Sequence, residues 1–429
     1  MSKITRRDFI KFTGMGAAAA GFGAVGFSSA ARAANGAHVV VVGGGFGGAA
    51  CAKYLKRTDP SLKVTLIEAN KQHLTCPFSN YVIAGWRPMN SLAQTYTGFA
   101  QKHGVDVVHD TVTAIDPAGR KVTLKGGKSV AYDRLVVAPG IELKWGAIKG
   151  YDEKAAQAMP HAWKAGQQTL LLQSKLRAMK NGGTVIVVAP ANPFRCPPGP
   201  YERASVIAHY LKANKPKSKI LILDSKDAFS KQALFTEGWN TLYPGMIEWV
   251  AAAKGGKVVA VDTKSMTVEG DIDKHKGDVV NVIPPQTAGK IALDAGLADG
   301  SGFCPVEPNT MESKVHKGIY VIGDSSIAGT MPKSGFSANS QAKMAAAAIA
   351  TELRGGTPED SSFVNTCYSL LAPNYGISIV GVYRATPEGI KDVPGSGGIS
   401  PRGTDAEFRA QEARYALGWY ASIVADTWA

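Results

Sequence analysis

The sequence has few cysteines, and it lacks the short cysteine motifs that hold metals or haem. Five cysteines occur among 429 residues. None of them forms a C-x-x-C pair or lies at metal-ligand spacing from histidines, so the pattern predicts no metal site. The absence of C-x-x-C-H excludes a c-type haem attached to this chain.

Clusters of basic residues interleaved with aromatics are also missing, although the formal net charge is +14. This absence argues against nucleic acid as a partner. A dispersed basic surface suits an acidic protein partner or contact with solvent equally well. Beyond the N-terminal leader, no apolar run has the length that spans a bilayer, so we expect no transmembrane segment in the mature chain.

The N-terminus has the pattern of a targeting segment. Arg6 and Arg7 form a twin-arginine pair, residues 12–30 are small, weakly apolar and uncharged, and residues 31–33 form an Ala-x-Ala cleavage site. We therefore expect a signal peptide at 1–33, a mature chain from Ala34, and export to the periplasm by the twin-arginine pathway. The alternative, an uncleaved membrane anchor, is disfavoured because the stretch is rich in Gly and Ala.

A dinucleotide-binding fingerprint follows the leader. Residues 38–42 read HVVVV, a strand buried on both faces, and a glycine turn with Gly43, Gly45 and Gly48 comes directly after it. An apolar helix at 49–56 and a strand at 63–67 follow, and the strand ends at Glu68, about 20 residues after Gly48. The glycines permit close approach of a pyrophosphate to the helix, and Glu68 can accept hydrogen bonds from ribose hydroxyls.

Two later strands suggest which dinucleotide is bound. Residues 132–140 end in a Pro-Gly turn, and residues 318–324 end in Gly-Asp. Both segments resemble the flavoprotein disulfide reductase superfamily. The resemblance implies that the cofactor is FAD and that Asp324 binds its ribityl chain. The alternative is that Asp324 only caps the following helix.

A second dinucleotide fold begins near residue 181. A strand is expected at 183–189, a helix at 201–212 and another strand at 219–224. The turn between the first strand and the helix carries several prolines and Gly199, where a nicotinamide-binding relative has G-x-G-x-x-G. We therefore expect a Rossmann-like domain that has lost the use of NAD(P)H. Cys196 stands in this turn.

Three segments and the leader together indicate a family. Residues 73–80 read HLTCPFSN, residues 195–202 read RCPPGPYE and residues 332–339 read PKSGFSAN. Over essentially the whole mature chain, the sequence resembles the flavoprotein subunit of flavocytochrome c sulfide dehydrogenase. The implied fold is α/β, with two Rossmann-like domains of the disulfide reductase type and a smaller C-terminal α+β region. The expected limits are 34–145 and 266–350 for the FAD domain, 146–265 for the second domain and 351–429 for an interface region.

The resemblance also implies roles for three cysteines. Cys76 would carry FAD covalently as a thioether to the flavin 8α carbon, whereas the alternative is a free Cys76 beside noncovalent FAD. Cys196 and Cys367 would form a redox-active disulfide that hydrosulfide attacks. The alternative is a structural disulfide that only stabilises the fold. The product would be sulfur or polysulfide.

The resemblance and helix electrostatics suggest further site residues and a partner. Glu202, at a helix start, is a candidate proton acceptor, or an acid that the helix dipole favours. Lys333 and the helix beginning near Gly335 would stabilise negative charge at flavin N1 and O2, unless the lysine is simply solvated. Because the chain binds no haem, electrons would leave through a cytochrome c subunit in a heterodimer.

Other classes share many of these features. A sulfide:quinone oxidoreductase would need contact with a membrane surface, and residues 408–424 do have helical apolar spacing. This stretch lacks a lysine-rich polar face, which favours core or partner contact. A pyridine-nucleotide disulfide reductase is disfavoured by the missing second glycine motif. A flavin-bearing accessory subunit of another sulfur-oxidising enzyme would share every FAD motif.

Overall fold

The computed structural model describes residues 36–429, so the expected signal peptide at 1–33 lies outside the described residues. A five-stranded sheet, in which every pairing is parallel, forms the first body of the fold. Its strands are short runs of Val, Ile and Leu that are buried, as a sheet covered on both faces requires. In spatial order they are β20 (Ile319–Val321), β9 (Arg134–Val137), β1 (His38–Val42), β2 (Lys63–Ile67) and β5 (Asp106–Val108).

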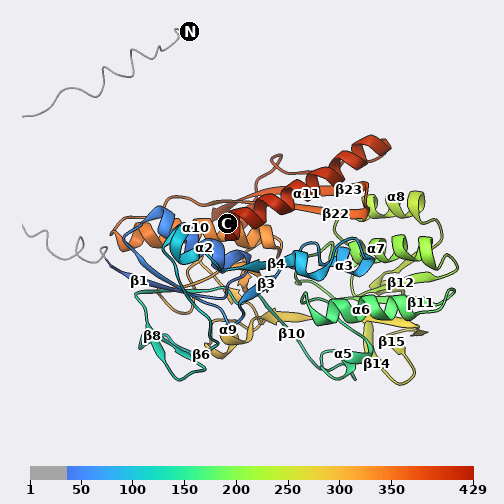
Figure 1. Cartoon of the computed structure of the whole chain (residues 1–429), viewed down its shortest axis with the longest axis horizontal. Helices are drawn as coiled ribbons and strands as arrows, with labels where there is room; N and C mark the ends of the chain where they lie inside the picture. The colour runs from blue at the N-terminus through green and yellow to red at the C-terminus, as the bar shows by residue number, and fades with distance from the viewer. Residues whose placement is uncertain (1–35) are drawn as a thin grey trace, which may run out of the picture.

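Two helices pack against each other over this sheet (Figure 1). They are α2 (Phe46–Thr58), which follows the glycine turn, and α10 (Gly335–Leu353). The helix expected at 49–56 is therefore present and longer at both ends. An antiparallel meander lies beyond the sheet, with strands β6 (Val112–Asp116), β7 (Lys121–Leu124) and β8 (Ser129–Ala131).

A second parallel sheet forms the other body. Its four strands have the order β13 (Ile247–Val250), β12 (Lys219–Asp224), β11 (Thr184–Ala189) and β17 (Val279–Val282). The accompanying helices are α6 (Gln167–Ala178), α7 (Gly199–Asn214) and α8 (Gln232–Leu242). Helix α7 begins at Gly199, earlier than the expected residue 201, so the proline-rich turn before it is correspondingly short. An antiparallel sheet completes this body, with β14 (Val258–Asp262), β15 (Thr267–Gly270) and β16 (Lys274–Lys276).

Short elements connect the two bodies. Strand β10 (Ile141–Leu143) leaves the first body and pairs antiparallel with β18 (Gln286–Ala288), which returns from the second. The remaining elements are β3 (Gln72–Leu74), α3 (Ser79–Ala84), η2 (Met89–Leu92), β4 (Ala93–Thr95), α4 (Phe99–His103), α5 (Ala155–Ala158), η3 (Ala252–Lys254), α9 (Lys290–Asp294), β19 (Cys304–Pro305), η4 (Gly323–Ser325) and β21 (Ser326–Ile327). The domain limits expected from the sequence stay a prediction.

The C-terminal region bridges both bodies. Strands β22 (Ser362–Ala372) and β23 (Tyr375–Thr386) form a long hairpin, extended by β24 (Gly389–Asp392) and β25 (Gly398–Ile399). Strand β22 packs against α10 of the first body and α7 of the second. Helix α11 (Ala406–Trp428) then runs along this hairpin to the C-terminus, drawn in red in Figure 1.

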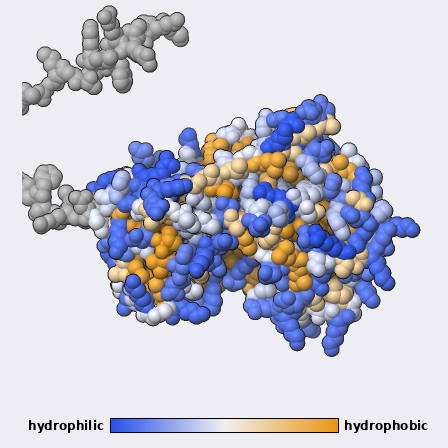
Figure 2. Space-filling view, in the orientation of Figure 1, coloured by the Kyte–Doolittle hydropathy of each residue, from blue (hydrophilic) through white to orange (hydrophobic). Residues whose placement is uncertain are grey.

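These elements confirm the expected architecture of two Rossmann-like halves and a C-terminal α+β region. Cys51 and Cys304 are fully buried in the core of the first body, where they act as packing residues. Between residues 36 and 429, no helix combines the length and the apolar character needed to cross a bilayer. Figure 2 shows hydrophilic residues around the periphery of one face and hydrophobic residues in several patches between them.

Candidate functional site

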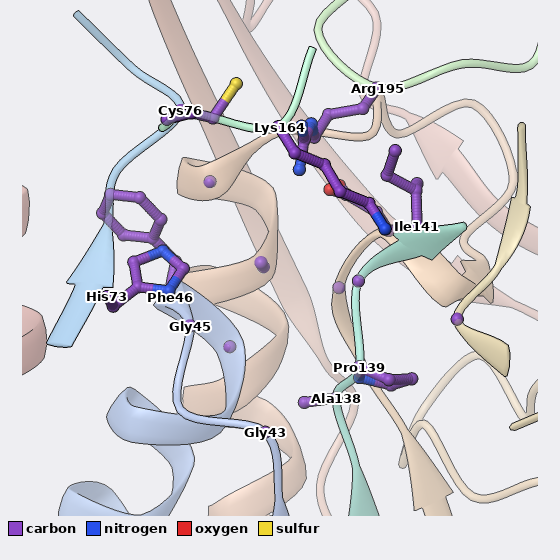
Figure 3. A pocket seen from close by; sticks show the side chains of 18 of the residues that line it. Gly43, Gly45, Phe46, His73, Cys76, Ala138, Pro139, Ile141, Lys164 and Arg195 are labelled. Atoms are coloured by element: carbon purple, nitrogen blue, oxygen red, sulfur yellow. The ribbon is translucent and has the colours of Figure 1, made fainter. Parts of the chain in front are cut away.

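A cavity of about 1030 Å³ is lined by residues from both bodies and from the C-terminal hairpin. Its size is at the upper end of the range for small-molecule sites. In Figure 3, Gly43 and Cys76 lie at opposite ends of the view. His73 and Phe46 lie along one side between them, and Ala138, Pro139 and Ile141 lie along the other.

The glycine turn at one end leaves no room for side chains. Gly43 has φ +98°, and a Cβ there would lie 2.4 Å from the carbonyl oxygen of Ala138. A Cβ on Gly48 would lie 1.8 Å from the carbonyl oxygen of Gly43, so Gly48 allows α2 to pack on β1. A Cβ on Gly45 would approach the ring of His73 to 3.3 Å. The turn therefore presents bare backbone to the cavity at the N-terminus of α2, which is the cradle a pyrophosphate needs.

Glu68 lines the same end of the cavity. Its carboxylate accepts a hydrogen bond from the backbone N–H of Gly44 at 2.7 Å and from that of Asn70 at 2.9 Å. These bonds fix both carboxylate oxygens and leave further lone pairs on each of them. The arrangement suits a ligand with two adjacent hydroxyl groups.

Asp324 lies in the short helix η4 and also lines the cavity. Its Oδ1 atom is buried and has no hydrogen-bond partner among the described residues, and burial raises the pKa of the carboxyl group. The alternative of a helix cap is wrong, because Ser334 caps α10 by accepting a hydrogen bond from the N–H of Ser337. A buried carboxylate oxygen without a partner fits the hydroxyl-bearing ribityl chain of FAD.

Lys333 is not among the residues that line the cavity, and its side chain is held by the protein itself. Its expected role at flavin N1 and O2 stays a prediction. Its Nζ donates to the carbonyl oxygens of Asp324 at 2.9 Å and Ser326 at 2.8 Å. The ammonium also lies 3.9 Å from the ring centroid of Phe303, and burial lowers its pKa to about 8. The side chain is therefore not simply solvated. The N-terminus of α10 does reach the cavity, through Ser334 and Gly335.

Three cysteines line the cavity, and Figure 3 shows one of them, Cys76, at the end opposite the glycine turn. The other two are close enough to interact electrostatically with one another, and Cys196 also with Cys76. Cys76 lies in the loop between β3 and α3, Cys196 in the turn before α7, and Cys367 on β22. In this structure all three are free thiols, so the expected disulfide between Cys196 and Cys367 is not formed. Burial raises the pKa of both of these thiols, and at Cys196 the neighbouring Cys76 and Cys367 raise it further.

The backbone at Cys196 is strained. This residue has φ +59°, a left-handed conformation that non-glycine residues rarely adopt outside functional sites. Two hydrogen bonds hold it there: its N–H donates to the carbonyl oxygen of Lys333 at 2.8 Å, and its own carbonyl accepts from Gly199 at 2.8 Å. Lys333 thus contributes to the site through its backbone, by holding the Cys196 turn against the first body.

Glu202 lies in the first turn of α7, buried, and lines the cavity near the cysteines. Its carboxylate accepts hydrogen bonds from Asn80 Nδ2 at 2.7 Å, Tyr81 Oη at 3.0 Å and the N–H of Leu370 at 3.1 Å. Burial raises the pKa of Glu202 despite these bonds. The raised pKa brings this carboxyl group closer to the pH at which it can take up a proton. Glu202 is therefore not simply a solvated acid at a helix end.

Sequence reasoning missed several charged and aromatic residues at this end. Arg203 and Arg195 line the cavity. His73 also lines it, nearer the glycine turn, and burial lowers its pKa to about 4. Lys231 is buried and lowers the pKa of the Cys367 thiol. One signal was present in the sequence: Arg203 comes directly after Glu202 and is followed by the mostly apolar stretch 204–208.

Comparison with known proteins agrees with this geometry. Residues 169–284 match the family described as "Sulfide dehydrogenase [flavocytochrome c] flavoprotein chain, central", and residues 359–428 match its flavin-binding region. Residues 37–188 match pyridine nucleotide-disulphide oxidoreductases. The sulfide dehydrogenase flavoprotein chain of Chlorobaculum thiosulfatiphilum is 66% identical over 44 residues, which are 10% of this chain and 92% of that sequence. The chain belongs to the flavocytochrome c sulfide dehydrogenase flavoprotein family.

Membership of this family, together with the cradle at Gly43 and the unpaired oxygen of Asp324, identifies FAD as the cofactor. Residues 3–23 match the twin-arginine signal sequence, so this family member is exported to the periplasm.

More distant relatives share the fold. A sulfide-quinone reductase of Aquifex aeolicus is 29% identical over 183 residues, 43% of this chain and 41% of that protein. A mitochondrial sulfide:quinone oxidoreductase of Dictyostelium discoideum is 24% identical, and the matched region spans 65% of its length. The crystal structure of the Aquifex aeolicus sulfide:quinone oxidoreductase superposes with a TM-score of 0.71 at 20% identity, covering 91% of this chain and 92% of that one. The chain thus spans less than two thirds of the length of either of the first two relatives.

Proposed function

We propose that this chain oxidises sulfide to sulfur or polysulfide in the periplasm and passes the electrons through FAD to a cytochrome c subunit. One observation carries the proposal: Cys76, Cys196, Cys367 and Glu202 all line one cavity whose other end is a dinucleotide cradle. Sulfur chemistry and a cofactor site are thereby joined in a single space. Family membership makes sulfide the expected substrate.

Cys196 and Cys367 would work as a disulfide in the oxidised enzyme. Hydrosulfide attacks one sulfur of the bridge, forming a new S–S bond to that cysteine and breaking the bond between the two. The products are a persulfide on one cysteine and a thiolate on the other. Loss of two electrons and one proton from this pair re-forms a bridge that contains one additional sulfur. FAD, when bound, supplies a two-electron acceptor that can return the electrons singly.

Glu202 would take the proton released in this sequence. Its raised pKa makes the carboxylate a stronger base, closer in pKa to the thiol or persulfide that loses the proton. It also lines the cavity that contains the reacting cysteines. Asn80 and Tyr81 fix the carboxylate, so that it does not rotate away from the cavity. This environment supports the assignment of Glu202 as proton acceptor.

Cys76 would bind the cofactor covalently. It lies in the loop after β3, away from the glycine turn that cradles the pyrophosphate, and lines the same cavity as the redox pair. A covalent bond at this end would keep FAD on a protein that works outside the cytoplasm. The position of the thiol supports such a bond.

The C-terminal region would carry the partner. Trp419 of α11 lines the cavity, whereas Tyr415 and Leu417 of the same helix are 55% and 53% exposed. Val364 and Val380 on the adjoining hairpin are 41% and 40% exposed. An apolar surface directly beside the cavity wall is a suitable place for a cytochrome subunit that receives electrons.

A single assay tests the proposal. The purified holoprotein is mixed with sulfide and either oxidised cytochrome c or a soluble quinone, and reduction of each acceptor is followed by absorbance. We expect cytochrome c reduction that depends on sulfide. Preferential quinone reduction would instead identify a sulfide:quinone oxidoreductase, the second candidate that the shared fold supports. Absence of both would indicate an accessory subunit.

A further inference from the structure

Two buried cations stand beside the cysteine end of the cavity, and the mechanism above does not use them. The exposed fractions of Arg203 and Lys231 are 1% and 4%. Arg203 follows Glu202 on α7 and lines the cavity, whereas Lys231 immediately precedes α8. Burying a charge is costly unless it is compensated, so each of these residues requires an explanation.

Uncharged oxygens hold the Arg203 guanidinium in place. Its Nε donates to Asn80 Oδ1 at 3.0 Å, and its terminal nitrogens donate to Asn281 Oδ1 at 3.0 Å and to the carbonyl oxygens of His161 and Ala162 at 3.0 and 2.6 Å. Ala162 has φ +46°, which is a strained conformation. In this conformation two successive carbonyl groups, those of His161 and Ala162, both accept hydrogen bonds from Arg203. The orientation of Arg203 is therefore fixed, while its charge is not neutralised by any of these partners.

Lys231 is held in a similar way. Its Nζ donates to Ser369 Oγ at 2.8 Å and lies 5.8 Å from the ring centroid of Phe235. Ser369 is on β22, two residues beyond Cys367 and therefore on the same face of the strand, so the ammonium lies on the face that carries that thiol. Lys231 itself has φ +62°, again a left-handed conformation for a side chain that rarely adopts it. Its hydrogen-bond acceptor, too, is uncharged.

The charges at this end do not balance until an anion is present. Glu202 is the carboxylate that interacts with both cations, and its hydrogen bonds go to Asn80, Tyr81 and Leu370. Arg203 and Lys231 against one carboxylate leave an excess of one positive charge, and Arg195, which also lines the cavity, adds to it. A cysteine thiolate, or the persulfide that hydrosulfide forms, supplies one negative charge at the place where the excess lies.

We propose that Arg203 and Lys231 are the counter-cations of an anionic sulfur at the Cys196 and Cys367 pair, and that they hold this sulfur as thiolate or persulfide in the buried cavity. The formation of a persulfide at this pair rests on the proposed function, whereas the stabilisation of the cysteine thiolates does not. Arg203 and Lys231 are thus positioning residues that act on the reacting sulfur through their charge. Burial opposes ionisation of both thiols, and Lys231 lowers the pKa of Cys367 against this effect.

The titratable or charged groups at this end, Arg203 and Lys231 included, belong to several elements. Each of them contributes to the pH dependence of thiol ionisation. They are Cys76 and Tyr81 from the α3 segment, Arg195 and Cys196 from the turn before α7, Glu202 and Arg203 from α7, Lys231 before α8, and Cys367 from β22. A variant that removes one cation while keeping these other groups isolates the effect of that cation.

The test measures thiolate directly, without sulfide turnover. The FAD-loaded protein is reduced with a phosphine, and alkylation of Cys196 and Cys367 by iodoacetamide is followed from pH 6 to 10 by mass spectrometry of the peptides, about the range in which thiols titrate. In Lys231→Met and Arg203→Met we expect alkylation of at least one of the two cysteines to become about tenfold slower at pH 7.5, because a rise of one pKa unit lowers the thiolate fraction tenfold. The whole profile should move to higher pH.

Matched variants separate charge from packing. Lys231→Arg and Arg203→Lys keep the positive charge and should keep the wild-type pH profile, and Lys219→Met, an exposed lysine at the start of β12, should do the same. Lys231→Gln keeps a hydrogen-bond donor for Ser369 but removes the charge. It replaces Lys231→Met as the neutral variant if Lys231→Met does not fold. Unchanged profiles in folded, FAD-loaded neutral variants would overturn the proposal. If the shift is present but wild-type protein does not oxidise sulfide, the proposed function fails while the counter-cations stand.

Discussion

Trp428 stacks on His73, with 5.3 Å between the ring centroids and an interplanar angle of 23°. His73 lines the cavity beside the glycine turn, and Trp428 also packs edge-on against Phe46 at 4.8 Å. The ammonium of Lys53 holds the tail by donating to the carbonyl oxygens of Asp426 at 3.0 Å and Ala429 at 2.8 Å. The last residues of the chain thus pack against His73 and Phe46, two residues that line the cofactor cavity.

This contact predicts that the C-terminal tail stabilises the loaded protein. Trp428→Ala removes a buried ring and should lower the free energy of unfolding by about 3 kcal/mol, the usual cost of an aromatic-to-alanine change in a core. Trp428→Phe keeps a ring against His73 and should cost less. Thermal unfolding of the holoprotein, with the FAD content of each preparation, checks this. Equal midpoints for both variants and wild type would show that this packing does not stabilise the loaded protein.

Changing Cys76 to Ala tests the covalent bond. If Cys76 carries FAD as a thioether, acid precipitation of wild-type protein should leave the flavin on the polypeptide, whereas the variant should release it. The potential of the bound flavin should also fall in the variant. Fluorescence of the denatured protein on a gel is the measurement. Residual fluorescence on the variant polypeptide would place the linkage elsewhere, and His73 on β3, which also lines the cavity, is then the candidate.

Glu202→Gln should slow sulfide oxidation by about 10² to 10⁴-fold, the usual contribution of a general acid or base. Because burial raises the pKa of Glu202, the wild-type rate should fall with acidification at a pH above the ordinary titration range of glutamate. Glu359→Gln, which changes an exposed acid, is the control. A glutamine variant with wild-type turnover would move the proton acceptor to another residue.

The same pKa shift has a consequence for stability. A carboxyl group whose pKa is higher in the folded state contributes stability that is fully present below its unfolded pKa and is lost as pH rises through the folded pKa. The wild-type protein should therefore lose stability over that interval relative to Glu202→Gln. Denaturant unfolding at several pH values measures the difference.

Much of the fold was predictable, because it follows from local patterns. The valine run at β1, the glycines after it and Glu68 specify a strand, a turn and a helix within one short segment. The paired charges at the cysteine end were not predictable, because Arg203 and Lys231 are brought together with β22 only by tertiary packing. The direction of the Lys333 side chain likewise depends on the carbonyl groups of η4 and β21, which no spacing in the sequence reveals.

NADH and NADPH should not reduce the flavin. In a nicotinamide-binding domain, the acid at the end of the second strand is free to bind ribose. Here that position is Asp224, which is fully buried and already accepts hydrogen bonds from Tyr201 at 2.5 Å and Trp249 at 2.9 Å, with Lys226 beside it. Anaerobic mixing with either nucleotide should leave the flavin absorbance unchanged. Rapid bleaching would contradict the proposed oxidoreductase class.

The remaining prediction concerns Cys196 and Cys367, where a redox role and a structural role have different consequences. Both thiols line the cavity, and the strained turn at Cys196 is held by the backbone of Lys333 rather than by a bond to sulfur. Loss of the disulfide should therefore affect chemistry more than folding. We expect Cys196→Ser and Cys367→Ser each to reduce sulfide-dependent cytochrome c reduction by orders of magnitude while FAD stays bound.

A structural disulfide predicts the opposite result. Its removal should cost a few kcal/mol, roughly 3 to 5 for a bridge that closes so long a loop, yet leave most of the turnover at low temperature. Stopped-flow reduction of the flavin by sulfide in the folded double-serine variant decides between the two. Near-normal bleaching there would falsify the disulfide mechanism, because sulfide would then be reducing the flavin without an electrophilic sulfur on the protein.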